Sequence, residues 1–476
     1  MKKTFISLTA LLFAFSVNAQ KDKVLENLSK KENYYGSIAK QIWNYAEMGY
    51  LEQKSSALLQ ETLKKEGFQI QAGVAEIPTA FTATFGEGKP VIGILGEFDA
   101  LPGLSQDSIP EKKSLGAVAG HACGHHLFGT ASAATAIAVK DWMKANNIKG
   151  TVRFYGCPAE EGGSGKVYMV RAGLFNDVDA VIHWHPGSAN SANASSSLAN
   201  KSAKFRFYGV SAHAAGAPDK GRSALDGVEA MDMMVNMMRE HVPDDTRIHY
   251  VITNGGKAPN VVPDFSEVYY YARSPRRDDL MMIWDRIEKA AQGAALGTGT
   301  KMDYEVIGGT YEILPNETLA KVMHANLSKV GGVNYTEAEK TFAEKIIKTM
   351  SSEEPEYDYT DASKVRPFAK ETGKGFGSTD VGDISWVVPT VGLRTATWVT
   401  GTPAHSWQAV AAGGMSIGKK GMMVAAKTMT LTAMELFENQ QIIAKAKEEL
   451  EVARGGKNFK YISLLGDRKP ALDYRK

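Results

Sequence analysis

Short apolar runs alternate with amphipathic patterns from residue 23 to residue 199 of the chain. Apolar positions three and four residues apart predict helices over 23–51, 55–66, 125–142 and 166–172. Apolar and β-branched runs predict strands over 81–85, 91–95, 152–155 and 181–182. This alternation favours an α/β fold with a mostly parallel or mixed sheet that is flanked by helices.

The pattern changes near Ala199 to the order strand, helix, strand, strand, helix, strand. The strands are expected over 204–208, 247–253, 261–272 and 302–307, and the helices over 224–241 and 279–296. This order is typical of a ferredoxin-like α+β domain that is inserted into the first one. The earlier pattern returns at Tyr311, with helices expected over 316–330, 336–350 and 416–438 and a strand over 391–399.

These changes divide the chain into five parts. A signal peptide is expected over 1–19, and the first domain is built from 20–199 and 311–440. The inserted domain covers 200–310. The last part, 441–476, is highly charged and is expected to be a solvated tail.

Composition and charge narrow the class of protein. With 43% hydrophobic and 23% charged residues, the chain of 476 residues has an ordinary globular composition. Its formal net charge of +2 provides no basic field for nucleic acid or an anionic membrane surface. Lys2 and Lys3 precede an apolar stretch over 5–17 and a cleavage site after Ala19, as in a secretory signal peptide. We therefore expect an exported protein, periplasmic or secreted; the alternative is a hydrophobic N-terminal helix that is retained.

Metal-capable side chains gather where strand-like runs end. Four such side chains lie within the six residues 121–126, and they include Cys123 and His125. The neighbouring clusters hold Glu97, Asp99, Glu160, Glu161, His183 and His185, and a later motif holds His405. Because ligands bind beyond the carboxyl ends of strands in open α/β sheets, we expect one shared metal site.

The adjacent carboxylates Glu160 and Glu161 are expected to have different roles. On a strand end their side chains point to opposite sides. One can bind metal while the other takes a proton from the attacking water, and a general base contributes ~10²–10⁴-fold to rate. A solvated loop start is the alternative, and the Pro and glycines around the pair weaken it.

The chain has two cysteines, Cys123 and Cys157. In an oxidising compartment a single disulfide between them is one interpretation. The histidines around Cys123 favour a thiolate ligand instead. Cys157 has no such neighbours, and we expect it to be a buried small hydrophobe.

The Cys-Gly-His motif at 123–125 and the Pro-Ala-Glu-Glu-Gly motif at 158–162 are specific in combination. With the motif at His405, residues 25–435 resemble the aminoacylase and glutamate-carboxypeptidase family of co-catalytic metallopeptidases, in its amidohydrolase branch with a metal-binding Cys. The resemblance implies two divalent metal ions per protomer, Zn²⁺ or Mn²⁺. It implies the metal ligands Cys123, which bridges both ions, His125, Glu161, His185 and His405.

The same resemblance implies further roles. Glu160 matches the general base, and Asp99 matches a carboxylate that orients a metal-binding His. The inserted domain is implied to be a lid and dimerisation domain, in which His213 reaches the site of the partner protomer and stabilises the oxyanion. Asn260 and Arg273 match positions that hold the substrate and its carboxylate, which suits an Arg fork.

Three positions depart from the pattern of this family. Glu97 stands where the wider family has a metal-binding His and this branch usually has Asp. His126 replaces a common Asp or Asn, and His183 is an extra His beside a ligand position. These departures leave the choice of metal open and admit an alternative ligand.

The leading hypothesis is a dimeric two-metal amidohydrolase that cleaves an amide to a small carboxylate-bearing amine, as in p-aminobenzoyl-glutamate. A broad N-acyl amino acid hydrolase or dipeptidase is the alternative enzyme. A non-catalytic periplasmic metal- or peptide-binding protein is the alternative of another class, and the intact Glu160 weakens it. The partner is expected to be a second copy of the chain or a different chain in a heteromer, and no nucleic acid or membrane is expected.

Overall fold

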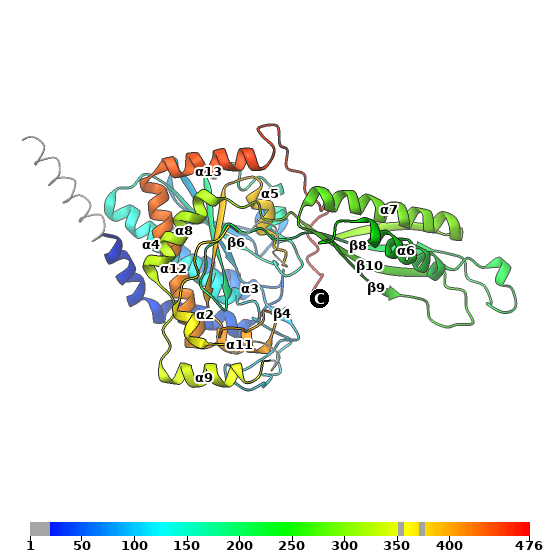
Figure 1. Cartoon of the computed structure of the whole chain (residues 1–476), viewed down its shortest axis with the longest axis horizontal. Coiled ribbons are helices and arrows are strands. Elements are labelled where there is room, and N and C mark those ends of the chain that lie inside the picture. Colours follow the sequence, from blue (N-terminus) through cyan, green and yellow to red (C-terminus); the bar gives the residue numbers. More distant parts are fainter. Residues whose placement is uncertain (1–19, 351–356, 371–376) are drawn as a thin grey trace, which may run out of the picture.

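A six-stranded mixed sheet forms the centre of the first domain in the computed structural model, which describes residues 20–350, 357–370 and 377–476 (Figure 1). The predicted signal peptide over 1–19 lies outside the described residues. The strands, in spatial order, are β1 (Gln69–Ala72), β2 (Phe81–Glu87), β6 (Gly150–Cys157), β3 (Val91–Glu97), β7 (Ala180–Gly187) and β12 (Thr390–Ala396). The pairs β6–β3, β3–β7 and β7–β12 are parallel, and β1–β2 and β2–β6 are antiparallel. The predicted mostly parallel or mixed sheet is therefore confirmed.

Helices cover this sheet on both faces. All seven residues of β3 are therefore buried. The chain enters through a helical segment over 20–30. The longer helices that follow are α2 (Glu32–Tyr45), α3 (Gln53–Lys65), α4 (His125–Asn146), α8 (Glu317–Val330), α9 (Glu337–Ile347), α12 (Ser416–Glu438) and α13 (Gln440–Ala453). Shorter elements are α5 (Gly165–Arg171), α10 (Val381–Ser385), α11 (Trp407–Gly413), β4 (Leu101–Pro102) and β5 (Ala119–Gly120).

Helices α4 and α12 pack against each other, and both contribute residues to the main core. Helix α4 begins at His125, which is where the sequence predicts it to begin, and its first two turns are buried throughout. It follows that the polar side chains at its N-terminus are held inside the protein. None of the helices that the structure describes is both long and apolar enough to span a membrane.

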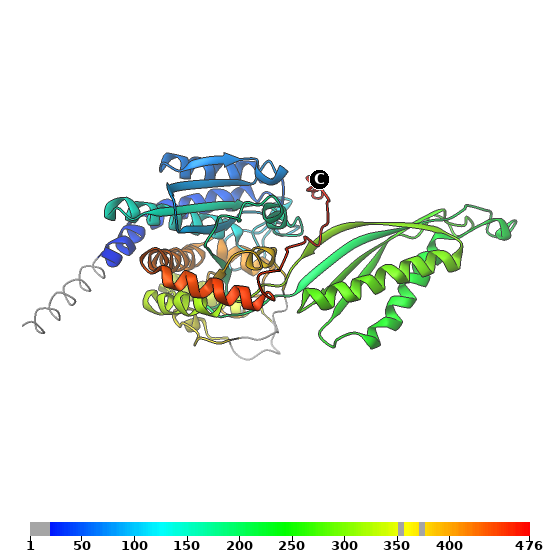
Figure 2. The same cartoon turned by 90° about the horizontal axis from the view of Figure 1, so that it is seen from above.

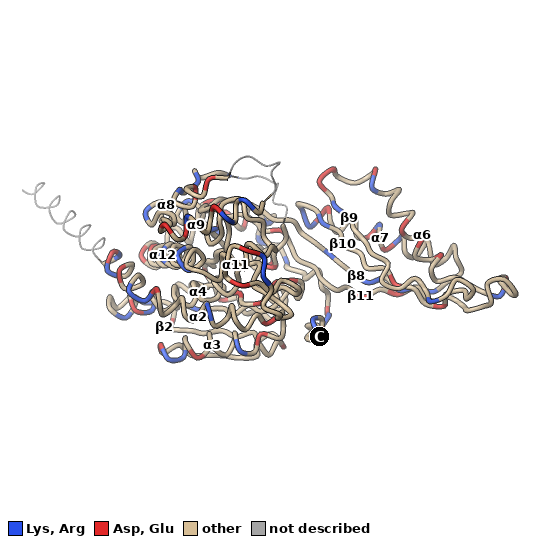
Figure 3. The backbone as a smooth tube through the Cα atoms, turned by 90° about the horizontal axis from the view of Figure 1, so that it is seen from below, with Lys and Arg blue, Asp and Glu red and all other residues tan. Residues whose placement is uncertain are grey.

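The inserted domain has the strand and helix order that the sequence predicts. It consists of β8 (Ala199–Tyr208), α6 (Ala224–Met238), β9 (Arg247–Asn254), β10 (Phe265–Ser274), α7 (Arg277–Thr298) and β11 (Lys301–Thr310). The antiparallel sheet has the order β11-β8-β10-β9, as in a ferredoxin-like domain. Side chains of β10 alternate between buried and partly buried, so α6 and α7 cover one face (Figure 2). Acidic and basic residues are interspersed over both domains (Figure 3).

The prediction of a solvated tail over 441–476 is wrong. Most of its first part belongs to helix α13, which packs on α8 and α12. The residues that follow include the buried Leu464 and Leu465 and end near the junction of the two domains (Figures 1 and 2). The sequence predicts a solvated tail because this part is highly charged and has few apolar positions. In the structure, several of its polar side chains instead donate to backbone carbonyls of other segments.

Candidate metal centre

The strands of the first sheet bring the predicted clusters together at one edge. Glu97 is the last residue of β3, and its register partner in β6 is Cys157, which directly precedes the Glu160–Glu161 turn. His185 lies near the end of the neighbouring parallel strand β7. Because parallel strands point the same way, their carboxyl ends meet where α4 begins. The prediction that these clusters share one region rests on this geometry.

Three overlapping groups of side chains lie close enough to hold metal ions. The first group is Cys123, His125 and His185, and the second is Cys123, Glu161 and His405. The third is Glu97, His125 and Glu160. Within each group the ligand atoms lie within 4.8 Å of one another. Cys123 belongs to the first two groups, which is the geometry that a bridging thiolate requires.

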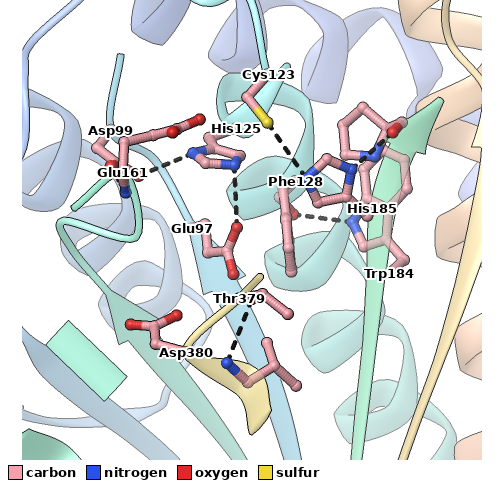
Figure 4. A network of polar contacts seen from close by, with 12 residues as sticks. Glu97, Asp99, Cys123, His125, Phe128, Glu161, Trp184, His185, Thr379 and Asp380 are labelled. Carbon is pink, nitrogen blue, oxygen red and sulfur yellow. Dashed lines mark hydrogen bonds and ion pairs between the residues drawn. The ribbon is translucent and has the colours of Figure 1, made fainter. Parts of the chain in front are cut away.

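His125 is fixed between two carboxylates (Figure 4). Its Nδ1 atom lies 2.8 Å from Oδ1 of Asp99, and its Nε2 atom lies 3.1 Å from Oε2 of Glu97. Burial lowers the pKa of His125, but the negative charges of Cys123, Asp99 and Glu97 outweigh it and raise that pKa overall. The same negative charges would stabilise a divalent cation bound near Nε2.

Unsatisfied buried atoms test whether metal ions fit here. In the described structure Oε2 of Glu97, Nε2 of His125 and Oε1 of Glu161 are buried and make no hydrogen bond of good geometry. The first two atoms lie 3.1 Å from each other, and Oε1 of Glu161 lies 3.2 Å from Nε2 of His405. Buried polar atoms are normally paired, so each of these needs a partner. The donor set of one thiol, several imidazoles and several carboxylates suits Zn²⁺ and leaves Mn²⁺ open. The residues therefore fit a pair of divalent cations.

The backbone around the ligands is strained in places. Gly124, between Cys123 and His125, has a φ of +78°, and a Cβ there would lie 2.7 Å from Cβ of Pro186. Only glycine tolerates both conditions. His405 also has a positive φ, +60°, and its N–H donates to the carbonyl of Ala122. Non-glycine residues in this region are costly and concentrate at functional sites.

Glu160 and Glu161 lie in the turn after β6, not on the strand end as expected. The two side chains still point to different neighbours, as predicted. Glu160 belongs to the group with Glu97, and Oε1 of Glu161 lies 3.2 Å from Nε2 of His405. Burial raises the pKa of Glu160 well above its usual range, and the negative charges of Glu97 and Glu161 add to the shift. The two carboxylates thus face different partners.

Sequence reasoning missed a buried charge cluster under the site. Lys166 on α5 has its Nζ atom 2.6 Å from Oε1 of Glu97 and 2.6 Å from Oδ1 of Asp380, and all three side chains are buried. Burial lowers the pKa of Lys166, but the two carboxylates outweigh it and keep the amine charged. Lys166 therefore holds Glu97 in place against His125. No local pattern marks Asp380, which is 214 residues from Lys166.

His121, His126, His183 and Cys157 lie outside the three candidate groups, and their side chains are buried or half-buried in the protein. Nε2 of His121 lies 3.0 Å from the carbonyl oxygen of Ile42, and Nε2 of His126 lies 3.0 Å from that of Gly413. His183 is absent from the three groups found among the described residues and packs against Gly392. Of the three departures from the family pattern, only Glu97 therefore reaches the candidate ligands. Both cysteines are free and buried, which argues against the disulfide.

The structure separates the three predicted residues of the inserted domain. His213 and Asn260 lie close together. The backbone of His213 forms an isolated antiparallel β-bridge with Val261, and the N–H of Ala214 donates to the carbonyl of Asn260. Strand β8 has ten residues, so it carries this pair about 30 Å from the junction with the catalytic domain at ~3.3 Å per residue. Arg273 is at the other end of β10, paired in register with Asn200 at the start of β8. Within one chain, Asn260 and Arg273 cannot contact the same small substrate.

Comparison with known proteins agrees with this architecture. Residues 199–298 match the peptidase dimerisation domain of the M20 type. The chain is 42% identical over 440 residues to the B component of p-aminobenzoyl-glutamate hydrolase from Escherichia coli K12, covering 87% of this chain and 91% of that protein. The chain belongs to the M20 peptidase family. It is a metal-dependent amidohydrolase, as the sequence predicts.

More distant relatives share the length and the fold. The Xaa-Arg dipeptidase of Mus musculus is 27% identical and the match covers 90% of this chain and 92% of that protein. A solved structure of a putative aminohydrolase from Staphylococcus aureus covers 87% of this chain and 99% of its own, with a TM-score of 0.65 at 16% identity. The YXEP protein of Bacillus subtilis, described as a dinuclear metal binding peptidase, has a TM-score of 0.60 at 17% identity and covers 86% of this chain and 99% of its own.

Proposed function

We propose that this M20 hydrolase uses two divalent metal ions to cleave an amide between an acyl group and a small carboxylate-bearing amine such as glutamate. The observation that carries the proposal is the grouping of four ligand-type side chains around the Cys123 thiol. Cys123, His125 and His185 would hold one ion, and Cys123, Glu161 and His405 would hold the other. Glu160 belongs to neither of these two groups, and we assign it as the base; it shares the third group with Glu97 and His125.

The proposed mechanism assigns each group a distinct task. Divalent metal ions supply Lewis-acid polarisation of a carbonyl oxygen and lower the pKa of water. Glu160 takes the proton of the attacking water and then gives it to the leaving nitrogen, as a general base and acid does. Asp99 keeps His125 in one orientation through the bond to Nδ1.

Substrate binding is proposed to use both protomers of a dimer. The distance along β8 favours delivery of His213 and Asn260 to the site of a partner protomer, where His213 stabilises the oxyanion. Arg273 lies near the junction with its own catalytic domain and forms a cation–π contact with Tyr271, 5.5 Å from the ring centroid. Its guanidinium is proposed to bind the carboxylate of the substrate, since Arg binds carboxylates bidentately.

The acyl part of the substrate has two supported candidates. The relative that is 42% identical is named for p-aminobenzoyl-glutamate, and this identity favours an aroyl-glutamate. The Xaa-Arg dipeptidase, at 27% identity over a similar length, favours a dipeptide. We rank the aroyl-glutamate first because the identity to the p-aminobenzoyl-glutamate hydrolase component is much higher over a similar share of the chain.

Assembly, metal and location belong to the same proposal. The dimerisation domain supports a dimer. The two differently named components of the Escherichia coli hydrolase match this chain at 42% and 23% identity, which leaves a heteromer open. We propose a homodimer, with Zn²⁺ or Mn²⁺ in both sites. Export is proposed from the N-terminal sequence over 1–19, and cell fractionation with N-terminal sequencing of the purified protein tests it.

A hydrolysis panel tests the proposal. The protein, without residues 1–19, is incubated with p-aminobenzoyl-glutamate, N-acetyl amino acids and simple dipeptides, and products are identified by mass spectrometry. Cleavage that a chelator stops and that Zn²⁺ or Mn²⁺ restores is the expected result, with p-aminobenzoyl-glutamate ranked first. Binding of these compounds without cleavage, in protein that holds its metal, contradicts the proposal and favours a binding protein.

A further inference from the structure

The residues after helix α13 form an extended segment that contacts both domains; we name residues 457–476 the C-terminal strap. Its first half packs on both domains, because Leu465 belongs to the core of the catalytic domain and Leu464 to that of the inserted domain. The ring of Phe459 lies 5.3 Å from that of Trp386, and Leu464 and Leu465 are buried. The Tyr461 hydroxyl donates to Asp383 at 2.6 Å. These contacts are those of an ordered structural element.

The strap next binds the strand that leaves the inserted domain. Nη1 of Arg468 donates to the carbonyl oxygens of Val306 at 2.6 Å and Ile307 at 2.8 Å, and its Nη2 pairs with Glu305 at 3.0 Å. All three partners lie on β11. On the catalytic side, Arg171 of α5 donates to the carbonyl of Gly466 at 2.7 Å. The strap therefore joins the inserted domain to the helix that follows the Glu160–Glu161 turn.

The end of the strap reaches the turn itself. The Tyr474 hydroxyl donates to the carbonyl oxygen of Glu161 at 2.9 Å, and Nη2 of Arg475 donates to the same oxygen at 2.8 Å. The N–H of Glu161 donates to Oδ2 of Asp99 at 2.9 Å. Both ends of this residue are thus fixed by side chains from distant parts of the sequence. The Tyr474 ring also contacts Tyr50, whose hydroxyl donates to the carbonyl of Gly163 at 2.6 Å.

The turn needs such support because its own backbone is strained. Ala159 has a φ of +56° and Ser164 a φ of +59°, values that non-glycine residues rarely adopt. Such conformations persist only when the surroundings over-determine them. Tyr50 and Glu52 support the turn from one part of the chain, since Glu52 accepts from the N–H of Ala159 at 2.8 Å. The strap supplies the remaining contacts, at the residue that carries the proposed ligand.

We propose that the C-terminal strap positions the catalytic turn, and that Tyr474 and Arg475 are positioning residues that act through the Glu161 carbonyl. They hold the Glu161 carboxylate toward His405 and Cys123 and keep Glu160 in place beside it. Through Arg468 the same segment links the turn to β11, so the turn and the exit of the inserted domain are held by one element. The catalytic part of this inference rests on the proposed function.

The test compares the wild-type protein with the double variant Tyr474→Phe/Arg475→Met, both as the full chain without residues 1–19. Hydrogen exchange of the peptide that covers residues 158–165 is the first measurement, and it does not depend on catalysis. We expect exchange there to be at least ~10-fold faster in the variant, because the Glu161 peptide loses two of its three side-chain contacts. With the hydrolysed substrate, we expect kcat to fall ~10- to 100-fold with KM nearly unchanged, and one metal ion to bind more weakly.

Controls separate positioning from general stability. Lys469→Met removes an exposed cation of the same strap, whose ion pair with Glu76 is a surface contact at 3.4 Å, and it should leave exchange in the turn and kcat unchanged. Tyr474→Phe with Arg475→Lys should recover part of kcat, since Lys restores a donor. Unchanged exchange in the turn of the double variant overturns the inference, and so does a loss of activity that matches the loss of folded protein. If the wild-type protein hydrolyses nothing while exchange still rises in the variant, the proposed function fails and the positioning role stands.

Discussion

The carboxylate of Asp99 contacts the Nδ1 atom of His125 at 2.8 Å, and both side chains are buried. Its second oxygen accepts the backbone N–H of Glu161 at 2.9 Å. His125 and Glu161 belong to different candidate metal groups that share Cys123. One carboxylate therefore orients a ligand in each group, and its loss should be felt at both.

Asp99→Asn should weaken metal binding ~10- to 100-fold, which is the usual cost of losing a carboxylate behind a ligating His. Chelator-competition titration of metal-loaded protein measures this affinity. Asp141→Asn is the matched control, because Asp141 lies on α4 with 52% of its side chain exposed. The metal affinity of this variant should equal that of the wild-type protein. Equal affinity for the Asp99 variant would show that Asp99 orients no ligand.

Lys166→Met should destabilise the fold by ~3–5 kcal/mol, because it leaves the buried carboxylates of Glu97 and Asp380 without a cation. Thermal unfolding of the metal-free protein measures the effect without a contribution from bound ions. Lys65→Met, which removes an exposed pair with Glu61, should leave the free energy of unfolding nearly unchanged. Adding Asp380→Asn to Lys166→Met should restore part of the loss. An unchanged melting temperature in Lys166→Met is the result against this account.

Asp383 should make stability depend on pH. Burial raises its pKa to about 7, although the Tyr461 hydroxyl and the N–H of Tyr311 donate to it. Between pH ~4 and ~7 the folded state thus binds more protons than the unfolded state, whose carboxyl titrates near ~3.9. The stability that this group contributes is fully present below pH ~4 and is lost as pH rises through 7. At ~1.4 kcal/mol per pKa unit, the loss is roughly 4 kcal/mol.

Asp383→Asn cannot ionise and should lack this loss. Calorimetric melting of variant and wild type, measured side by side at pH 4, 6 and 8, cancels the other titrating groups. The melting temperature of the variant should gain on that of the wild type as pH rises. A constant difference across this range would mean that Asp383 titrates at an ordinary pKa.

Local patterns predicted much of the fold and of the candidate site. The apolar spacing after His125 predicted helix α4 from its first residue, and the strand, helix, strand, strand, helix, strand order predicted the inserted domain. The clusters on either side of residues 121–126 could be grouped because each of them follows a short apolar strand, and the carboxyl ends of parallel strands meet at one edge. Such reasoning needs only sequence periodicity and the direction of parallel strands.

The rest depends on contacts that leave no local signal. Lys166 and Asp380 are in contact although the whole inserted domain lies between them in the sequence. Tyr474 and Arg475 bind a backbone carbonyl, and any residue at position 161 would present the same acceptor. A charged segment with few apolar positions therefore looks solvated in the sequence, although it is ordered in the structure. His121, His126 and His183 resemble ligands in the sequence, but their side chains are directed into the core.

The kcat of Glu160→Gln, measured on protein whose metal content is known, tests the central claim most directly. The substitution keeps the size of the side chain and removes its capacity to accept a proton. We expect kcat to fall ~10²–10⁴-fold with both metal ions still bound, because Glu160 belongs to neither of the two groups that share Cys123. Glu111→Gln, at an exposed carboxylate, should keep wild-type activity. Full activity of Glu160→Gln with its metal bound would contradict the assignment of the base and the mechanism built on it.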